Sequence, residues 1–266
     1  MSQVYVRASR NHRNEGLGMH SRGEVLRAIP LPGMLRSSSM RSRQTQPESG
    51  SYVSALGVRA LTGIYDPVVA LTTREKTWKR ELLRELNPLP GQRILDLGCG
   101  TGTLALMIKG SQPGAEVDGL DADPVMLDRA RRKSSEAGVD IRLRTGFAQD
   151  LPYEDDAFDA VVSSLFFHHL DRAQKIAAFL EIDRVTVPGG HVRIADWGRP
   201  SGLLMTLASV SIRALDGSAP TRDSLAGRLP EMLAEAGFEE VSEGATFQTI
   251  FGTLAVYGAR AKSSSR

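Results

Sequence analysis

The stretch Ile94-Leu95-Asp96-Leu97-Gly98-Cys99-Gly100-Thr101-Gly102 decides the fold of this chain. An apolar run that carries one acid leads into three glycines at alternate positions, and a second apolar run, residues 104–108, follows at once. This order predicts a buried strand, a tight turn and the start of a helix, because glycine adopts backbone angles that other residues resist. The first N–H groups of a helix have no partner within it and are available to a ligand. The stretch therefore predicts a βαβ unit with a ligand-binding turn.

The spacing of the glycines separates two kinds of ligand. The fingerprint of dinucleotide sites is G-x-G-x-x-G, which places a pyrophosphate at the helix N-terminus. Here the glycines follow G-x-G-x-G, and Asp96 stands two residues before the first of them. A carboxylate at the end of the strand suits a cationic ligand better than a diphosphate. The spacing therefore disfavours a nicotinamide cofactor.

The nine-residue stretch resembles motif I of the class I S-adenosylmethionine-dependent methyltransferases. Their cofactor carries a sulfonium and an ammonium and has no phosphate. Further matching stretches extend the resemblance over about residues 92–197, and residues 146–152 are similar to the adenine loop of the menaquinone and ubiquinone methyltransferase group. The resemblance implies S-adenosyl-L-methionine as cofactor and a seven-stranded, Rossmann-like sheet that is closed by an antiparallel pair of strands.

The composition is that of an ordinary globular protein of one or two domains, with 266 residues, 41% hydrophobic and 24% charged. No apolar run approaches the roughly 18 residues of a membrane-spanning helix, and no apolar signal core follows the basic N-terminal residues. The only cysteine, Cys99, allows no intrachain disulfide and no cysteine-based metal site. We therefore expect a cytoplasmic protein without a membrane span or a bound metal.

The N-terminal residues 1–50 differ from the rest in charge. They hold eight arginines, no lysine and three glutamates, so this segment has a net charge of +5 and the remainder is slightly acidic. An Arg- and Ser-rich composition of this kind predicts a disordered leader or an over-long N-terminus. A transit peptide and a basic arm that contacts nucleic acid are the two alternatives.

Strand-like and helix-like segments alternate from residue 74 onward. The expected strands are 93–97, 116–121, 141–143, 158–164 and 192–195, and the expected helices include 74–86, 124–138 and 172–187. In the last of these helices, Ile176, Phe179 and Leu180 are expected on one apolar face, and Pro188-Gly189-Gly190 is expected to end it. The alternation predicts an α/β fold with a doubly wound, mostly parallel sheet and right-handed crossovers.

The domain is expected to span residues 51–266, with N-terminal helices in 51–90. Residues 198–236 interrupt the alternation with two helices, 203–215 and 225–236, which we interpret as a lid over the substrate. Residues 239–247 and 249–259 then alternate like two strands with a short connection. They predict a C-terminal antiparallel hairpin at one edge of the sheet.

The resemblance implies a set of cofactor contacts. They are Asp96, Gly98, Gly100, Thr101, Gly102, Asp121, Ala122, Phe147, Ala148 and Ser164. Asp96 is expected near the methionine ammonium, with capping of the next turn as the alternative, and Asp121 is expected to accept hydrogen bonds from the ribose hydroxyls. The neighbouring Asp123 is expected to cap the helix that Pro124 opens.

Phe147 departs from the family pattern. The residue before the alanine of this loop is usually Asp or Asn, which binds the adenine amino group, whereas this chain has Phe147-Ala148. Phe147 could offer a stacking face, Gln149 or Asp150 could replace the missing hydrogen bond, or Phe147 could belong to the core. These alternatives stay open at the level of sequence.

His168 and His169 follow the strand 158–164, where the resemblance places the reacting methyl group. A neutral imidazole accepts a proton near neutral pH, so these two residues are the candidates for a general base, and structural histidines are the alternative. Adjacent residues on an extended chain point in opposite directions, which disfavours a shared metal ion. Asp196, Trp197 and Tyr65 are further candidates for the pocket wall, and the acids at 154–156 are interpreted as a solvated turn.

Together these features predict methyl transfer from S-adenosyl-L-methionine to a small apolar or aromatic molecule. Such a transfer needs alignment of the reacting atoms, and a base only if the acceptor must lose a proton. An apolar lid is expected from Leu203, Leu204, Met205, Leu207 and Val210, with core packing as the alternative.

Three other functions are possible alternatives to this prediction. Nucleic-acid methylation is disfavoured because the chain lacks an Asn/Asp-Pro-Pro-aromatic tetrapeptide and its single cysteine lies in the glycine turn. A non-catalytic S-adenosylmethionine-binding regulator or assembly protein is the main alternative. A nicotinamide oxidoreductase is the third. The sequence alone does not identify the acceptor or the oligomeric state.

Overall fold

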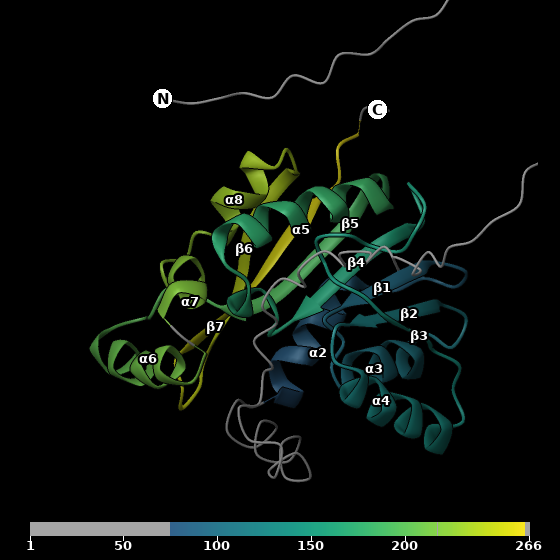
Figure 1. Cartoon of the computed structure of the whole chain (residues 1–266), viewed down its shortest axis with the longest axis horizontal. Coiled ribbons are helices and arrows are strands. Elements are labelled where there is room, and N and C mark those ends of the chain that lie inside the picture. Colours follow the sequence, from purple (N-terminus) through teal and green to yellow (C-terminus); the bar gives the residue numbers. More distant parts are fainter. Residues whose placement is uncertain (1–74, 217, 264–266) are drawn as a thin grey trace, which may run out of the picture. The chain divides into compact units, whose positions relative to one another are not determined.

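The computed structural model describes residues 75–216 and 218–263. Figure 1 shows their helices and strands, coloured along the sequence. The predicted leader 1–50, the part of the predicted N-terminal helices before residue 75, and Tyr65 lie outside the described residues. The helix expected at 74–86 is present as α2, Glu75–Leu86.

The described part of the chain forms a seven-stranded sheet with the order β3-β2-β1-β4-β5-β7-β6. The strands are β1 (Arg93–Leu97), β2 (Glu116–Asp121), β3 (Arg142–Thr145), β4 (Phe158–Ser164), β5 (Thr186–Trp197), β6 (Glu239–Gln248) and β7 (Thr253–Arg260). β1 to β5 pair in parallel, and β7 runs antiparallel between β5 and β6. The predicted fold class and the C-terminal antiparallel hairpin are confirmed.

β1 lies in the middle of this sheet and fixes where a ligand can bind. Its Asp96 is in register with Gly119 of β2 and Val162 of β4. The chain leaves β1 toward β2 and later returns to its other side as β4, so the strand order reverses at this point. Open α/β sheets bind ligands outside the carboxyl ends of the strands at such a switch point. The glycine turn follows β1 at that position.

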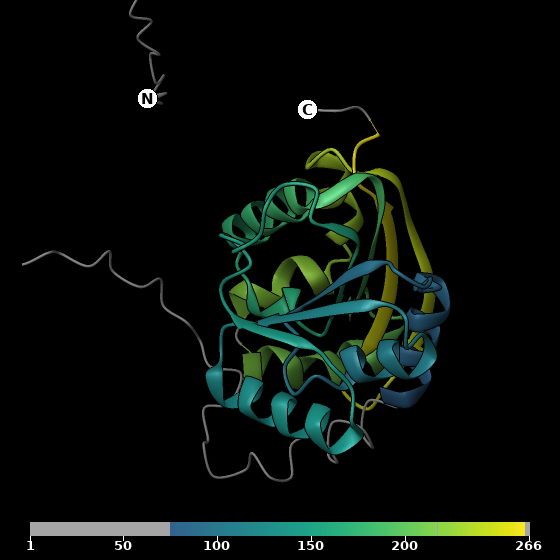
Figure 2. The ribbon, with the colours of Figure 1, turned by 90° about the vertical axis from the view of Figure 1, so that its right-hand side faces the viewer.

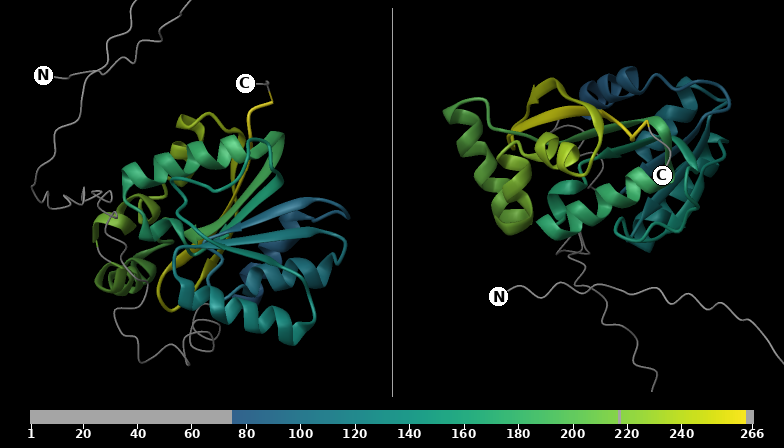
Figure 3. Two further views of the ribbon diagram at one scale, coloured as in Figure 1. Left: turned by 45° about the vertical axis from the view of Figure 1, so that its right-hand side comes forward. Right: turned by 90° about the horizontal axis from the view of Figure 1, so that it is seen from above.

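Helices cover both faces of the sheet, as Figures 2 and 3 show from the side and from above. They are α3 (Thr103–Ser111), α4 (Pro124–Ala137), α5 (Arg172–Val185), α6 (Leu203–Asp216), α7 (Ser218–Leu225), α8 (Leu229–Glu235) and a short 3₁₀ turn, η2 (Phe167–His169). Alternate residues of β1 face opposite sides: Leu95 joins a core with α5 and α8, whereas Ile94 joins a core with α2 and α3.

The structure corrects the prediction for α5 and β5. Ile176 and Leu180 are exposed. The buried face of the helix instead contains Lys175, Phe179 and Ile182, which follow the i, i+4, i+7 spacing of one helix face. The helix ends at Val185, and Pro188-Gly189-Gly190 belongs to β5 instead of preceding it. The pairing of β5 with β4 is irregular there, and Gly189 has φ +72°, which is typical of a bulge. β3 also begins one residue later than predicted.

The predicted helix 225–236 begins too early, and the helix before it was not predicted. The chain forms two helices, α7 and α8, which are separated by residues 226–228, with Gly227 at φ +70°. Pro230 opens α8, where a proline is compatible with the first turn. The predicted helix 225–236 contains only the last residue of α7, Leu225, and extends α8 backward across the break.

Candidate functional site

The glycine turn after β1 is built as its sequence predicts. Gly98, Gly100 and Gly102 have φ +67°, +53° and +74°. A Cβ at Gly98 would lie 2.4 Å from the Phe166 ring, and one at Gly102 would lie 3.0 Å from the Cβ of Ala130. A Cβ at Gly100 would meet no atom within 4 Å. Two glycines are therefore required by close packing, whereas the third borders open space at the switch point.

Asp96 is fully buried beneath this turn. Its Oδ2 accepts a hydrogen bond of 3.1 Å from the Ala105 N–H in the first turn of α3, so the alternative capping role is present. Its Oδ1 is buried and has no hydrogen-bond partner in the described part of the chain. Burial raises the pKa of Asp96 to about 7, against the opposing effects of Lys79 and the Ala105 N–H. An orphaned carboxylate oxygen of this kind fits an ammonium group.

Asp121 ends β2 beside the open side of Gly100. Its Oδ2 accepts from the Gly100 N–H at 2.8 Å, and its Oδ1 accepts from the Asp123 N–H at 2.9 Å. Burial raises its pKa, while these N–H groups partly oppose the shift. Each carboxylate oxygen has two lone pairs, so the carboxylate retains capacity for two hydroxyl donors. The predicted cap is confirmed, because the Asp123 side chain accepts from the Val125 N–H at 2.8 Å.

Thr101 and Ala122 flank these two acids. The buried Thr101 hydroxyl accepts a hydrogen bond of 2.8 Å from Lys133 of α4. Its side chain therefore links the turn to α4, and we expect a cofactor contact from its backbone only. Ala122 is half-buried, between the end of β2 and the cap of α4. Its contact with the cofactor stays a prediction.

The expected adenine loop presents Phe147 to solvent. The ring is 51% exposed, whereas Ala148 is buried in the core. Of the alternatives for Phe147, core packing is wrong, and its ring is available to stack on a base. The Phe147 carbonyl accepts from the Asp150 N–H at 3.2 Å, which closes a tight turn at the tip of the loop.

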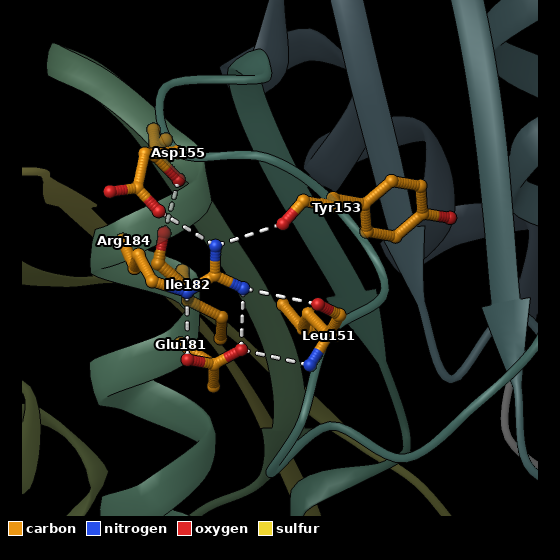
Figure 4. Close-up of polar contacts among 7 residues, drawn as sticks. Leu151, Tyr153, Asp155, Glu181, Ile182 and Arg184 are labelled. Carbon is orange, nitrogen blue, oxygen red and sulfur yellow. Dashed lines mark hydrogen bonds and ion pairs between the residues drawn. The ribbon is translucent and has the colours of Figure 1, made fainter. Parts of the chain in front are cut away.

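Two side chains of α5 hold the other end of this loop, as Figure 4 shows. Arg184 donates to the carbonyls of Leu151 (3.1 Å) and Tyr153 (2.8 Å) and to the Asp155 carboxylate (2.8 Å). It also forms a two-pronged pair with Glu181, whose Oε2 accepts from the Leu151 N–H at 2.8 Å. All three guanidinium nitrogens are thus engaged. This clamp was missed at the level of sequence, because no local pattern pairs a helical Arg with a loop about 30 residues earlier.

The carboxyl end of β4 supplies the opposite wall. Ser164 is half-buried and in register with Ala195 of β5, and its expected cofactor contact stays a prediction. Leu165 then has φ +52°, which is uncommon for a residue with a branched side chain. The turn directs Phe166 onto Gly98. Sequence analysis missed Phe166 as part of the site.

His168 is bound to Asp196, which lies near the end of β5. His168 Nδ1 lies 2.7 Å from Asp196 Oδ1, and the His168 N–H donates to Asp196 Oδ2 at 3.2 Å. Both side chains are buried. Although burial acts to raise it, the pKa of Asp196 is lowered, because His168 and the Trp197 N–H stabilise the carboxylate. Sequence analysis placed Asp196 only as a wall residue.

His169 has a different environment, although the centres of the two imidazole rings are only 4.0 Å apart. Burial, together with the neighbouring His168, lowers the pKa of His169 to about 3. A base this weak is poorly matched to proton transfer at neutral pH. The structure therefore separates two residues that sequence analysis treated alike.

The expected lid divides into two sides. Leu203, Leu204, Leu207 and Val210 of α6 are 86%, 72%, 71% and 58% exposed, whereas Met205 is buried. Core packing thus accounts for Met205 alone. The other four side chains form an apolar strip that the described residues leave uncovered.

Two further observations bear on the kind of site. Within residues 75–216 and 218–263, no three His, Cys, Asp or Glu side chains are grouped as a metal ion requires. Among the described helices, none is both long enough and apolar enough to cross a membrane.

Known proteins resemble this chain in sequence and in fold. A family model described as a methyltransferase domain matches residues 94–190. The demethylmenaquinone methyltransferase of Thermus thermophilus is 41% identical over 123 residues, 46% of this chain and 55% of that protein. The enzyme of the same name from Lactobacillus johnsonii is 30% identical over 184 residues, 62% of this chain and 75% of that protein. The crystal structure of the Bacillus subtilis YcgJ protein has a TM-score of 0.60 at 18% identity, covering 70% of this chain and 98% of that one.

The strand order and the glycine turn define the class I methyltransferase fold. The chain belongs to the S-adenosylmethionine-dependent methyltransferases, in the group of the menaquinone and ubiquinone biosynthesis enzymes. The predicted family and the cofactor of that family are confirmed. The chain spans about half the length of curated relatives such as the Thermus protein, of which it covers 55%.

Proposed function

We propose that this protein transfers the methyl group of S-adenosyl-L-methionine to a small, apolar or aromatic acceptor. The observation that carries the proposal is the buried pair of His168 and Asp196, which lies at the carboxyl ends of β4 and β5. A protein that only bound the cofactor would need the glycine turn and Asp121, but it would not need a carboxylate-held imidazole at that end of the sheet.

Residues on β1, β2 and the adenine loop would hold the cofactor. Asp96 Oδ1 would accept from the ammonium, Asp121 from the ribose hydroxyls, and the open face of Gly100 would lie against the methionyl part. Phe147 would stack on the adenine and Ala148 would border it. The cofactor supplies a methyl group on a sulfonium, so the protein does not have to generate the charge that drives the displacement.

The protein's part in the reaction is alignment and proton removal. Alignment of nucleophile, methyl carbon and sulfur supplies much of the rate in such displacements. An acceptor hydroxyl becomes a stronger nucleophile when it loses its proton as the new bond forms. His168 is the group proposed to take this proton, whereas the low pKa of His169 makes it a poor base.

The class of acceptor is inferred from the apolar strip of α6 and from the names of the relatives. Relatives of this chain are named for methylation of demethylmenaquinone, an aromatic quinone. The exposed strip of Leu203, Leu204, Leu207 and Val210 is suited to an apolar molecule of this kind. A reduced, hydroxyl-bearing naphthoquinol is therefore the first acceptor to test.

The test is turnover of purified protein with S-adenosyl-L-methionine against phenols, reduced naphthoquinols, amines and lipids, read by a mass increase of one methyl group. We expect a methylated phenolic or quinol product together with S-adenosylhomocysteine. Tight cofactor binding without a product from any acceptor class would contradict the proposal and favour the non-catalytic binding protein.

A further inference from the structure

Asp196 contacts His168 at two points and thereby fixes both its ring and its backbone. Oδ1 lies 2.7 Å from the ring nitrogen Nδ1, and Oδ2 accepts from the His168 N–H at 3.2 Å. Oδ1 also accepts from the Trp197 N–H at 2.6 Å. A carboxylate held by three donors, at the end of a central strand, has little freedom to rotate. The plane of the imidazole is set accordingly.

The contact also decides which nitrogen of His168 carries the proton. An ionised carboxylate can only accept hydrogen bonds, and the lowered pKa of Asp196 keeps it ionised at neutral pH. Nδ1 must therefore be the protonated nitrogen of the neutral ring, which leaves Nε2 as the basic one. A carboxylate that holds a histidine in this tautomer is the arrangement of catalytic triads, where the carboxylate also stabilises the imidazolium that forms.

The other charged groups near the pair do not duplicate this role. His169 lies beside His168 on η2, with the two ring planes tilted by 44°, and its own pKa is lowered to about 3 by burial and by His168. From α5, Lys175 donates to the carbonyls of Leu170 and Pro220, the latter at 2.7 Å. From α7, Asp223 is buried and lies 3.4 Å from Arg172. The carboxylate that contacts the His168 ring is that of Asp196, at 2.7 Å from Nδ1.

We propose that Asp196 is a positioning residue that holds His168 in the Nδ1–H tautomer, so that Nε2 removes a proton from a hydroxyl-bearing aromatic acceptor. The inference rests on the proposed methyl transfer and narrows its substrate class to acceptors that must lose a proton. The O–H bond of the acceptor breaks and its proton moves to Nε2. The freed electron pair drives bond formation between the methyl carbon and the nucleophilic oxygen or a ring carbon. When a ring carbon is methylated, its own proton then moves to the carbonyl oxygen, which restores the aromatic ring. The S–CH₃ bond breaks with its electrons on sulfur, and the imidazolium releases its proton to solvent.

The experiment compares wild type with Asp196→Asn, and it has one readout that needs no turnover. Nitrogen-15 NMR of the imidazole rings reports the tautomer, with the His168 signals assigned from a His168→Gln sample. We expect wild-type His168 to be protonated at Nδ1, and the Asn variant to show a mixed or Nε2–H form. An unchanged tautomer in the folded variant would overturn the role of Asp196.

The second readout is steady-state turnover with a reduced, short-chain 2-prenyl-1,4-naphthoquinone. We expect Asp196→Asn to lower kcat at least about tenfold, within the range of a general base, with KM for the acceptor and the dissociation constant of S-adenosylhomocysteine changed less than about twofold. A change in KM or in cofactor affinity with kcat preserved would show a merely structural role. Asp196→Glu keeps the charge and should recover part of kcat.

A matched control removes a buried carboxylate elsewhere. Asp183 of α5 is buried, its Oδ1 accepts from the Lys262 N–H at 3.3 Å, and it lies outside the site. Asp183→Asn should lower the melting temperature without altering the His168 tautomer or kcat.

If wild type methylates no acceptor, the proposed function fails, yet the tautomer still decides whether Asp196 orients His168. If Asp196→Asn does not fold, the wild-type spectrum decides, and a wild-type His168 protonated at Nε2 would contradict the proposal.

Discussion

The two walls of the site are built in different ways. On the cofactor side, the contacts of the two acids stay within one βαβ unit. Asp96 accepts from Ala105, nine positions on, and Asp121 accepts from Asp123, two positions on, and from Gly100, 21 positions back. On the acceptor side, Asp196 pairs with His168 from 28 positions away, and Lys175 reaches Pro220 over 45. The cofactor side is therefore a local motif that one βαβ unit can carry, whereas the acceptor side exists only after distant segments have packed together. We expect changes on the first side to alter binding and changes on the second to alter turnover.

The largest expected effect is on the acceptor side. His168→Gln should lower kcat by about 10²- to 10⁴-fold, because glutamine cannot take a proton, while S-adenosylmethionine binds as in wild type. Stopped-flow or steady-state turnover with calorimetry of the cofactor measures both quantities. Full activity in a folded His168→Gln protein would leave alignment alone as the mechanism and would remove the proposed difference between the two walls.

The next effect is on the cofactor side. Asp121→Ala removes an ionised hydrogen-bond acceptor worth roughly 1.5–3 kcal/mol, so cofactor binding should weaken by about 10- to 150-fold. Asp123→Ala is the matched control, because it removes only the helix cap and should cost about 1 kcal/mol of stability with nearly normal affinity. Calorimetry with S-adenosylhomocysteine separates the two. Equal dissociation constants in both variants would disprove the ribose contact.

The Arg184 clamp should matter for the adenine part of the cofactor. Arg184→Met frees the loop from the Leu151 and Tyr153 carbonyls. We expect about five- to twentyfold weaker binding, less than for the loss of one direct charged hydrogen bond, because the clamp acts through the loop. Arg131→Met, which removes an exposed pair with Asp128, should leave affinity unchanged. Methylthioadenosine, which contains the adenine but lacks the amino-acid end, should show the same loss. If only S-adenosylmethionine lost affinity, the clamp would not act through the adenine loop.

A smaller effect follows from the pKa of Asp96, which burial raises to about 7. Below pH 7 this carboxyl is largely protonated, whereas the ammonium of the cofactor favours the ionised form. Binding should therefore release a proton, and affinity should rise about three- to tenfold between pH 5.5 and 7. Calorimetry in two buffers of different ionisation enthalpy measures the proton. Asp96→Asn should abolish the dependence, and a flat profile in wild type would argue that Asp96 only caps α3.

The smallest expected effect on stability comes from the strip on α6. Leu207→Ser replaces a side chain that is 71% exposed, so the free energy of unfolding should change by about 0.5 kcal/mol or less. If the strip contacts the acceptor, KM for an apolar quinol should rise while the cofactor dissociation constant stays the same. The buried neighbour is the contrast, because Met205→Ser should lower stability by more. A KM unaffected by Leu207→Ser would leave the strip without a part in acceptor binding.

Much of the cofactor side could be predicted from sequence. β1, β2 and β4 have the predicted bounds, the three glycines take left-handed angles, and Asp123 caps α4. Periodicity failed where burial is set by other elements. Ile176 and Leu180 satisfy a helical apolar pattern yet lie exposed, and residues 226–228, predicted as part of a helix, separate α7 from α8.

By itself the sequence determined the features that depend on a few consecutive residues: the turn that only glycines can form, the acids that end two strands, and the alternation that makes a parallel sheet. Only the tertiary structure decided that Asp196, not a closer acid, holds His168, that Arg184 clamps the adenine loop, and that β7 lies between β5 and β6. The physical reason is the range of the interactions. Backbone angles and caps act within one turn of chain, whereas a buried ion pair or a strand position depends on which distant segments share the same space.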